Sequence, residues 1–229
     1  MNVVFDFGAV LFTWRPVDLM LECFPERAPT RAAAGHLAHE VFGHAEWQAF
    51  DRGSVTMPEV IAHVAQRVGL DAGVLGALVE SIGERLTPMP ESLALLERLM
   101  ALRGRDTAVG EPSDNLAVAA PGRAGTPLKL YFLSNMPAPY ARTLERMHPF
   151  LKEFDGGIFS ADELLIKPEP AIYQLLQTRY GLEPANTVFL DDLLPNIQAA
   201  RHEGWHGIHF QTAAQAAREL QALGLGLSP

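Results

Sequence analysis

Asp6 is the first residue whose type and position suggest chemistry. It follows the apolar run Asn2 to Phe5, which has the length and composition of a buried strand. A carboxylate held at a strand end can act as a nucleophile or as a metal ligand. Gly8 comes two residues later and would let the backbone turn sharply and approach a ligand closely. Taken alone, the same pattern also fits an aspartate that caps a turn.

The segment FLDDLLPN carries the most specific signal. Asp191 and Asp192 stand together directly after the apolar run Thr187 to Leu190. Adjacent carboxylates repel each other, so they need a cation or the N–H donors of a helix N-terminus. Oxygen ligands of this kind favour Mg²⁺ over zinc or copper. We therefore predict a magnesium site at this point.

Two further segments offer groups that could bind an anionic oxygen. The segment FLSN ends an apolar run in Ser134 and Asn135, which bring a hydroxyl, an amide and backbone N–H groups to one place. The segment IKPEP places Lys167 before a proline, which favours extended backbone at the lysine. A lysine fixed in this way can neutralise a phosphate as a point charge.

Alternating strand and helix patterns indicate an α/β fold. Such alternation predicts a Rossmann-like parallel sheet core of about five strands. Ligands of such sheets sit beyond the carboxyl ends of the strands, where Asp6, Ser134 and Asp191 are expected. The predicted strands are Asn2 to Phe5, Lys129 to Leu133, Gly156 to Phe159, Thr187 to Leu190 and Gly207 to Phe210. The predicted core helices are Pro90 to Arg103, Pro139 to Met147, Pro170 to Tyr180, Leu194 to Glu203 and Thr212 to Leu223.

The pattern changes between residues 14 and 87. Helical segments near Thr30 to Phe42, Met57 to Val68 and Ala72 to Leu86 follow one another there without a convincing strand. We predict a small all-helical cap, 14–87, inserted after the first strand of an α/β hydrolase core made of 1–13 and 88–229. Such a lid could cover the strand ends and exclude water. The Gly-, Pro- and Ala-rich stretch 104–127 is interpreted as a flexible insertion loop within the core.

Composition narrows the class of ligand. The 229 residues carry a net charge of -9 without a cluster of Lys and Arg, which argues against nucleic acid and against an anionic membrane surface. Cys23 is the only cysteine, so no internal disulfide can form. No apolar stretch approaches the roughly 20 residues that span a bilayer, and no cleavable leader pattern precedes the first strand. We expect a cytoplasmic protein, monomer or homodimer, that binds a small molecule.

Four segments of the chain resemble the haloacid-dehalogenase-like (HAD) hydrolases in their order, which is Asp6, Ser134, Lys167 and then Asp191 with Asp192. A helical segment follows the first, and the resemblance covers nearly the whole chain. The segment EWQAFDRGSVT, 46–56, is similar to the helical cap of the branch that contains glucose-1-phosphatase-like phosphatases. The resemblance implies a Mg²⁺-dependent phosphatase in which Asp6 attacks a small phosphorylated metabolite, a sugar phosphate or similar, and forms an aspartyl-phosphate. By position it assigns phosphate binding to Ser134, Asn135 and Lys167, and metal binding to Asp6, the Gly8 carbonyl, Asp191 and Asp192. Candidate substrate contacts on the cap side are Trp14, Trp47 and Arg52.

One departure from the family pattern matters for the chemistry. Most HAD phosphatases have a second aspartate two positions after the nucleophile, which serves as general acid and base, whereas this chain has Gly8. No proton donor exists at that point, so we expect a preference for anomeric sugar, acyl or aryl phosphates, whose leaving groups depart easily.

Two alternatives remain open. One is a metal-independent 2-haloacid dehalogenase, in which Asp6 attacks carbon and Lys167 binds the substrate carboxylate. The other is a catalytically weak protein that binds a phosphorylated ligand without turnover, and Gly8 is its main support. The retained acidic pair favours the phosphatase.

Overall fold

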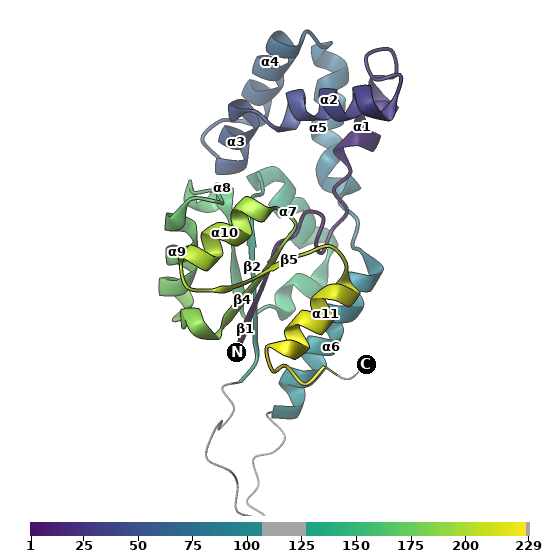
Figure 1. The fold of residues 1–229 in the computed structure, drawn as a ribbon. Coiled ribbons are helices and arrows are strands. Elements are labelled where there is room, and N and C mark those ends of the chain that lie inside the picture. Colours follow the sequence, from purple (N-terminus) through teal and green to yellow (C-terminus); the bar gives the residue numbers. More distant parts are fainter. Residues whose placement is uncertain (107–126, 228–229) are drawn as a thin grey trace, which may run out of the picture.

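The computed structural model describes residues 1–106 and 127–227, and the strands of this part form one parallel sheet (Figure 1). The strand order is β3-β2-β1-β4-β5. This arrangement confirms the predicted α/β fold with a five-stranded parallel sheet. The strands are β1 (Asn2–Phe5), β2 (Lys129–Ser134), β3 (Gly156–Phe159), β4 (Thr187–Asp191) and β5 (His206–His209).

The strand order places a topological switch at β1. Strands β2 and β3 extend the sheet on one side of β1, whereas β4 and β5 extend it on the other. Ligands of open α/β sheets bind at the carboxyl ends of the strands at such a switch. Phe5 is in register with Leu190, and the backbone N–H of Asp6 donates to the Leu190 carbonyl at 2.9 Å. Asp6 therefore lies next to Asp191 at the switch.

Both faces of the sheet are covered by helices. The side chains of Val3 and Phe5 belong to one apolar cluster and Val4 to the other, as alternation along a strand requires. Burial on both faces explains why the strands read as continuous apolar runs. One face packs against α6 (Pro90–Asp106), α7 (Ala138–Met147) and α11 (Ala213–Ala222), and the other against α9 (Pro170–Tyr180) and α10 (Leu194–His202). Short helical turns occur at η1 (Pro149–Glu153), α8 (Ser160–Glu163) and η2 (Pro184–Asn186).

The helical insertion predicted after the first strand is confirmed, and Figure 1 shows it beyond one end of the sheet. The sequence predicts three of its helices and misses α1 and α3, because eight residues are too few for a clear helical period. The two linkers to the core run side by side, with the N–H of Thr13 donating to the carbonyl of Thr87 at 2.8 Å. The cap helices are α1 (Pro16–Cys23), α2 (Arg31–Phe42), α3 (Ala45–Arg52), α4 (Met57–Val68) and α5 (Ala72–Arg85).

The exact domain limits, 14–87 for the cap and 1–13 with 88–229 for the core, stay a prediction. Helix α6 continues to Asp106, so the first residues assigned to the 104–127 loop are helical. Residues 107–126 of that loop lie outside the described part of the chain. Within the described part, no helix has the length and apolar character needed to cross a membrane.

Phe7, directly after Asp6, anchors the loop that carries the nucleophile candidate. Its side chain is fully buried, and its ring centroid lies 4.8 Å from that of Phe132 and 5.5 Å from that of Phe159. Its carbonyl also accepts hydrogen bonds from the N–H groups of Leu11 and Phe12, at 2.9 and 2.8 Å. Apolar packing and hydrogen bonds thus fix the backbone beside Asp6.

We expect Phe7→Ala to lower the free energy of unfolding by about 3–5 kcal/mol, because it opens a cavity in a closely packed aromatic cluster. Urea denaturation followed by circular dichroism measures the change. The matched control is Met147→Ala, whose side chain is 44% exposed and should cost less than about 0.5 kcal/mol. Equal stability losses in the two variants would contradict this assignment.

Candidate active site

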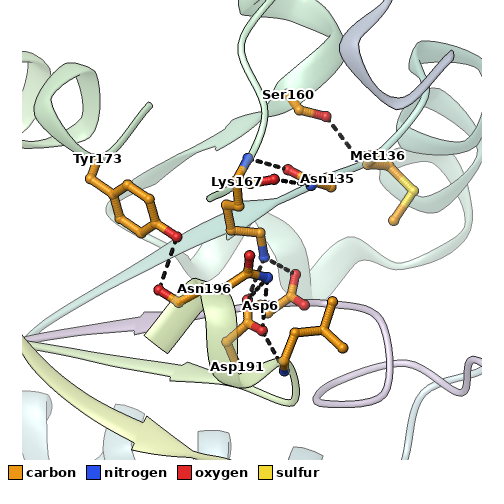
Figure 2. A network of polar contacts seen from close by, with 9 residues as sticks. Asp6, Asn135, Met136, Ser160, Lys167, Tyr173, Asp191 and Asn196 are labelled. Carbon is orange, nitrogen blue, oxygen red and sulfur yellow. Dashed lines mark hydrogen bonds and ion pairs between the residues drawn. The ribbon is translucent and has the colours of Figure 1, made fainter. Parts of the chain in front are cut away.

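Lys167 bridges the carboxylates of β1 and β4. Its Nζ lies 2.8 Å from Asp6 Oδ1 and 2.7 Å from Asp191 Oδ2, and Figure 2 shows the amine between the two acids. The lysine side chain is 1% exposed and its Nζ lies 5.3 Å from the ring centroid of Phe189. Burial alone would lower the pKa of Lys167, but the charges of Asp191 and Asp6 outweigh it and raise the pKa. The lysine therefore stays charged.

Asp191 is held by neighbours on both of its oxygens. Oδ1 accepts hydrogen bonds from the N–H of Leu193 at 2.8 Å and from Asn196 Nδ2 at 3.0 Å. Oδ2 accepts from Asn196 Nδ2 at 3.0 Å and from Lys167. The residue is fully buried, so these donors replace water. Asp191 is thus suited to position the lysine and the turn after β4.

The loop after β2 fixes the backbone of Lys167. Asn135 Oδ1 accepts a hydrogen bond from the N–H of Lys167 at 2.8 Å, and Asn135 Nδ2 donates to its carbonyl at 3.0 Å (Figure 2). An amide side chain can satisfy both backbone groups of one residue in this way. The lysine consequently reaches Asp6 from a backbone that is tied to the end of β2.

This end of the sheet carries more negative than positive charge, because three carboxylates stand beside one lysine. Burial raises the pKa of Asp6 to about 7, although Lys167 opposes the shift. Burial and the charge of Asp191 raise the pKa of Asp192 to about 6. One carboxylate oxygen from each of Asp6, Asp191 and Asp192 lies within 4.8 Å of the others. A divalent cation would relieve this excess of negative charge, and the oxygen donors fit Mg²⁺.

A cavity of about 240 Å³ lies between this cluster and the cap. At its core end it is lined by Asp6, Asn135, Lys167 and Asp192, and Gly8 also lines it. Aromatic and aliphatic side chains line much of the remainder. These are Trp14, Phe42, Trp47, Ile82, Leu86, Met136 and Tyr140.

Comparison with known proteins finds a relative that matches nearly the whole chain. No family model matches the chain. A sesquiterpene phosphatase of Aspergillus oryzae is 26% identical over 220 residues, which cover 96% of this chain and 94% of that protein. In its fold, the chain is similar to the haloacid-dehalogenase-like hydrolases.

Solved HAD structures share the fold. A HAD family enzyme of Bacteroides thetaiotaomicron, in complex with magnesium and inorganic phosphate, aligns with a TM-score of 0.62 at 18% identity and covers 92% of this chain and 94% of that one. The L-2-haloacid dehalogenase of Xanthobacter autotrophicus, with chloropropionic acid covalently bound, aligns with a TM-score of 0.60 at 21% identity and covers 100% of this chain and 84% of that one.

The structure brings most of the predicted site residues together, but three of them, Asp191, Ser134 and Arg52, do not line the cavity. Asp191 is fully buried and contacts Lys167. Ser134 is 1% exposed and does not line the cavity. Arg52 also points elsewhere, because its guanidinium pairs with Glu169 and donates to the Leu164 carbonyl at 3.2 Å. Trp14 and Trp47, the other two candidate substrate contacts, line the cavity as expected.

The sharp turn assigned to Gly8 is made one residue later. Ala9 has φ 57, in the left-handed region, whereas Gly8 is not among the residues with positive φ. A Cβ at position 8 would meet only the Cβ of Trp14, at 3.8 Å, an ordinary contact. Position 8 therefore has room for a side chain, and steric constraints do not require a glycine there.

Asp51, which the sequence does not single out, also lines the cavity. It lies near the end of α3, next to Arg52, inside the segment 46–56 that resembles a HAD cap. Burial raises the pKa of Asp51 to about 8, with a smaller rise from the charge of Asp6 and an opposing effect of Lys167. The only sequence feature that points to Asp51 as a site residue is its acidic side chain near the end of a cap helix. Local sequence cannot show that α3 reaches the cavity.

Replacing Lys167 by Met should lower the free energy of unfolding by about 3–5 kcal/mol near neutral pH, because two buried carboxylates lose their cation. The loss should shrink at mildly acidic pH, where Asp6, whose pKa burial raises to about 7, takes up a proton in the folded variant and the charge repulsion weakens. Denaturant melts at the two pH values measure both effects. Lys152→Met removes an exposed lysine and serves as the control. A pH-independent deficit would contradict the charge argument.

Proposed function

We propose that this protein is a Mg²⁺-dependent phosphatase that hydrolyses a small phosphomonoester through an aspartyl-phosphate on Asp6. The observation that carries the proposal is the contact of the Asp6 carboxylate with Lys167, beside an acidic pair and at the mouth of a cavity. The nearly full-length similarity to a sesquiterpene phosphatase supports the same reaction class.

The residues divide the work of phosphoryl transfer between them. Asp6 attacks phosphorus, while Lys167 and the amide of Asn135 stabilise negative charge on the transferring oxygens. Ser134, also predicted to bind phosphate, is the buried last residue of β2 and does not line the cavity. Asp191 holds Lys167 in place through its hydrogen bonds.

Three groups would hold the magnesium ion: the carboxylates of Asp6 and Asp192 and the carbonyl of Gly8. Asp191 supports them, because its own oxygens are already occupied by protein donors. When bound, the ion would neutralise charge on the phosphoryl group and orient it. The excess of carboxylates over lysine is the structural reason for expecting a divalent cation.

Dehalogenation of a 2-haloacid is the second candidate reaction, because the dehalogenase fold aligns over the whole chain. It would use Asp6 to attack carbon and would need no metal. Asp192, with a raised pKa and a place in the cavity, has no task in that scheme. The third possibility, a protein that binds a phosphorylated ligand without turnover, leaves the carboxylate of Asp6 without a chemical use.

The cavity favours an apolar organic group on the substrate over a sugar. Ring pairs form a continuous chain from Trp14 through Phe42, Trp47 and Phe50 to Tyr140, with centroids 4.6 to 5.7 Å apart. The Tyr140 hydroxyl already donates to the Val79 carbonyl at 2.8 Å. Few free polar groups therefore remain for sugar hydroxyls, whereas a hydrocarbon gains from this burial. The Aspergillus relative is a sesquiterpene phosphatase, so its substrate also carries an apolar group.

Phosphate release should depend on Mg²⁺ and on Asp6. We expect Asp6→Asn to reduce turnover by roughly 10⁴-fold or more, because the nucleophile is lost, and a chelator to silence the wild type. Release of inorganic phosphate from alkyl and aryl phosphates measures both. Asp71→Asn, which preserves the side-chain cap of α5, is the matched control. Chelator-resistant halide release from 2-haloacids would instead establish the dehalogenase.

The aromatic lining predicts a selectivity that two primary alkyl phosphates can test. We expect kcat/KM for octyl phosphate to exceed that for glucose 6-phosphate by about tenfold or more, since each buried CH₂ contributes about 0.8 kcal/mol. Trp14→Ala should reduce kcat/KM for octyl phosphate more than for glucose 6-phosphate. A preference of the wild type for glucose 6-phosphate would restore the sugar phosphate as the expected substrate.

A further inference from the structure

The cavity contains one acidic group that the proposed reaction does not yet use. Among the described residues that line it, Asp6, Lys167 and Asp192 serve as nucleophile, phosphate contact and metal ligand. Tyr140 is occupied by its bond to Val79, and burial raises its pKa above the ordinary value. Gly8 offers no side chain. Asp51 is therefore the remaining ionisable side chain that faces the substrate.

Two sets of contacts with the core hold Asp51 in place. One involves the backbone carbonyl of Asp51 itself, and the other involves the side chain of the next residue, Arg52. The Ser160 hydroxyl donates to the Asp51 carbonyl at 2.5 Å, and Ser160 Oγ accepts a hydrogen bond from the N–H of Met136 at 2.8 Å. Arg52 holds both oxygens of Glu169. These contacts join the end of α3 to the loops after β2 and β3, on which the core end of the cavity is built.

Close backbone packing continues at Gly53. Its φ is 81, and a Cβ there would lie 2.5 Å from the carbonyl oxygen of Ala161 in α8. Only a residue without a side chain allows α3 to approach α8 this closely. Asp51 is thus placed by the backbone of the cap and by the core together, and a shift of the cap would move it.

The Asp51 carboxyl group is chemically free. The backbone carbonyl of Asp51 accepts a hydrogen bond from Ser160. Its carboxyl oxygens form no hydrogen bond or ion pair with residues 1–106 and 127–227. A carboxyl group without a partner in a largely apolar cavity is costly when charged. Its pKa of about 8 means that it carries a proton near neutral pH. A general acid works best when its pKa lies near the working pH.

We propose that Asp51 is the general acid and base of the phosphatase reaction, supplied by the cap in place of the missing side chain at position 8. This inference rests on the proposed phosphatase function. It names a catalytic residue on the helical insertion, so the cap contributes to the chemistry as well as covering the cavity.

The proton balance follows in two steps. As an Asp6 oxygen bonds to phosphorus, the bond from phosphorus to the ester oxygen breaks, and that oxygen takes the proton of Asp51 and leaves as an alcohol. Water then attacks the phosphorus of the aspartyl-phosphate and gives a proton to the Asp51 carboxylate. The bond from phosphorus to Asp6 breaks, which releases phosphate and restores both aspartates.

Leaving-group dependence in Asp51→Asn tests the role directly. The experiment mixes excess protein and Mg²⁺ with octyl phosphate or with p-nitrophenyl phosphate and follows release of the alcohol in a single turnover. An octyl alkoxide needs a proton to leave, whereas nitrophenolate does not. We expect release of octanol to slow by about 10²–10⁴-fold and release of nitrophenol by less than about tenfold.

Two control variants separate proton donation from docking of the cap. Asp18→Asn changes an exposed cap aspartate and should leave both rates unchanged. Ser160→Ala loosens the end of α3 and should slow both substrates to a similar degree. Equal losses for the two substrates in Asp51→Asn would overturn the role of Asp51 while leaving the phosphatase in place. A wild type that releases neither alcohol would overturn the proposed function itself.

Discussion

Lys167 brings one positive charge to the carboxyl ends of β1 and β4, where Asp6 and Asp191 would otherwise repel each other. The register of the sheet puts these acids side by side, and burial of the lysine makes the interaction strong. The amide of Asn135, the N–H of Leu193 and the side chain of Asn196 complete the arrangement. The end of β2, the turn after β4 and the start of α10 therefore meet at one point.

The cap is attached to this centre through a few specific contacts. Its linkers run side by side at Thr13 and Thr87, while the end of α3 binds the core through Ser160 and Arg52. Between these two attachments lies the aromatic cavity. The cap helices thus supply the apolar lining of this cavity and place the acidic side chain of Asp51 in the same cavity as Asp6. Substrate selectivity and proton transfer therefore both depend on the position of the cap relative to the core.

The sequence predicts site residues at the strand ends more readily than those that the packing of the cap brings to the cavity. Asp6 and Asp192 could be assigned to one site because the ends of parallel strands converge at a topological switch. Lys167 lies in a loop and was assigned to the same site by the resemblance to the HAD hydrolases. Asp51 could not be assigned, because its position depends on the packing of α3 against α8, a contact between segments more than one hundred residues apart. Sequence also does not show which side chains at a strand end reach a cavity: Ser134 is predicted to bind phosphate, yet it is buried and does not line the cavity.

The most direct test of the central claim is a search for a phosphoryl group on Asp6. The protein is mixed with Mg²⁺ and octyl phosphate, quenched in acid within one turnover, digested and examined by peptide mass spectrometry. The account predicts a phosphoryl group on the peptide that contains Asp6, and none in Asp6→Asn. Release of phosphate by the wild type without any phosphorylated peptide, at times when octanol has already formed, would contradict the account.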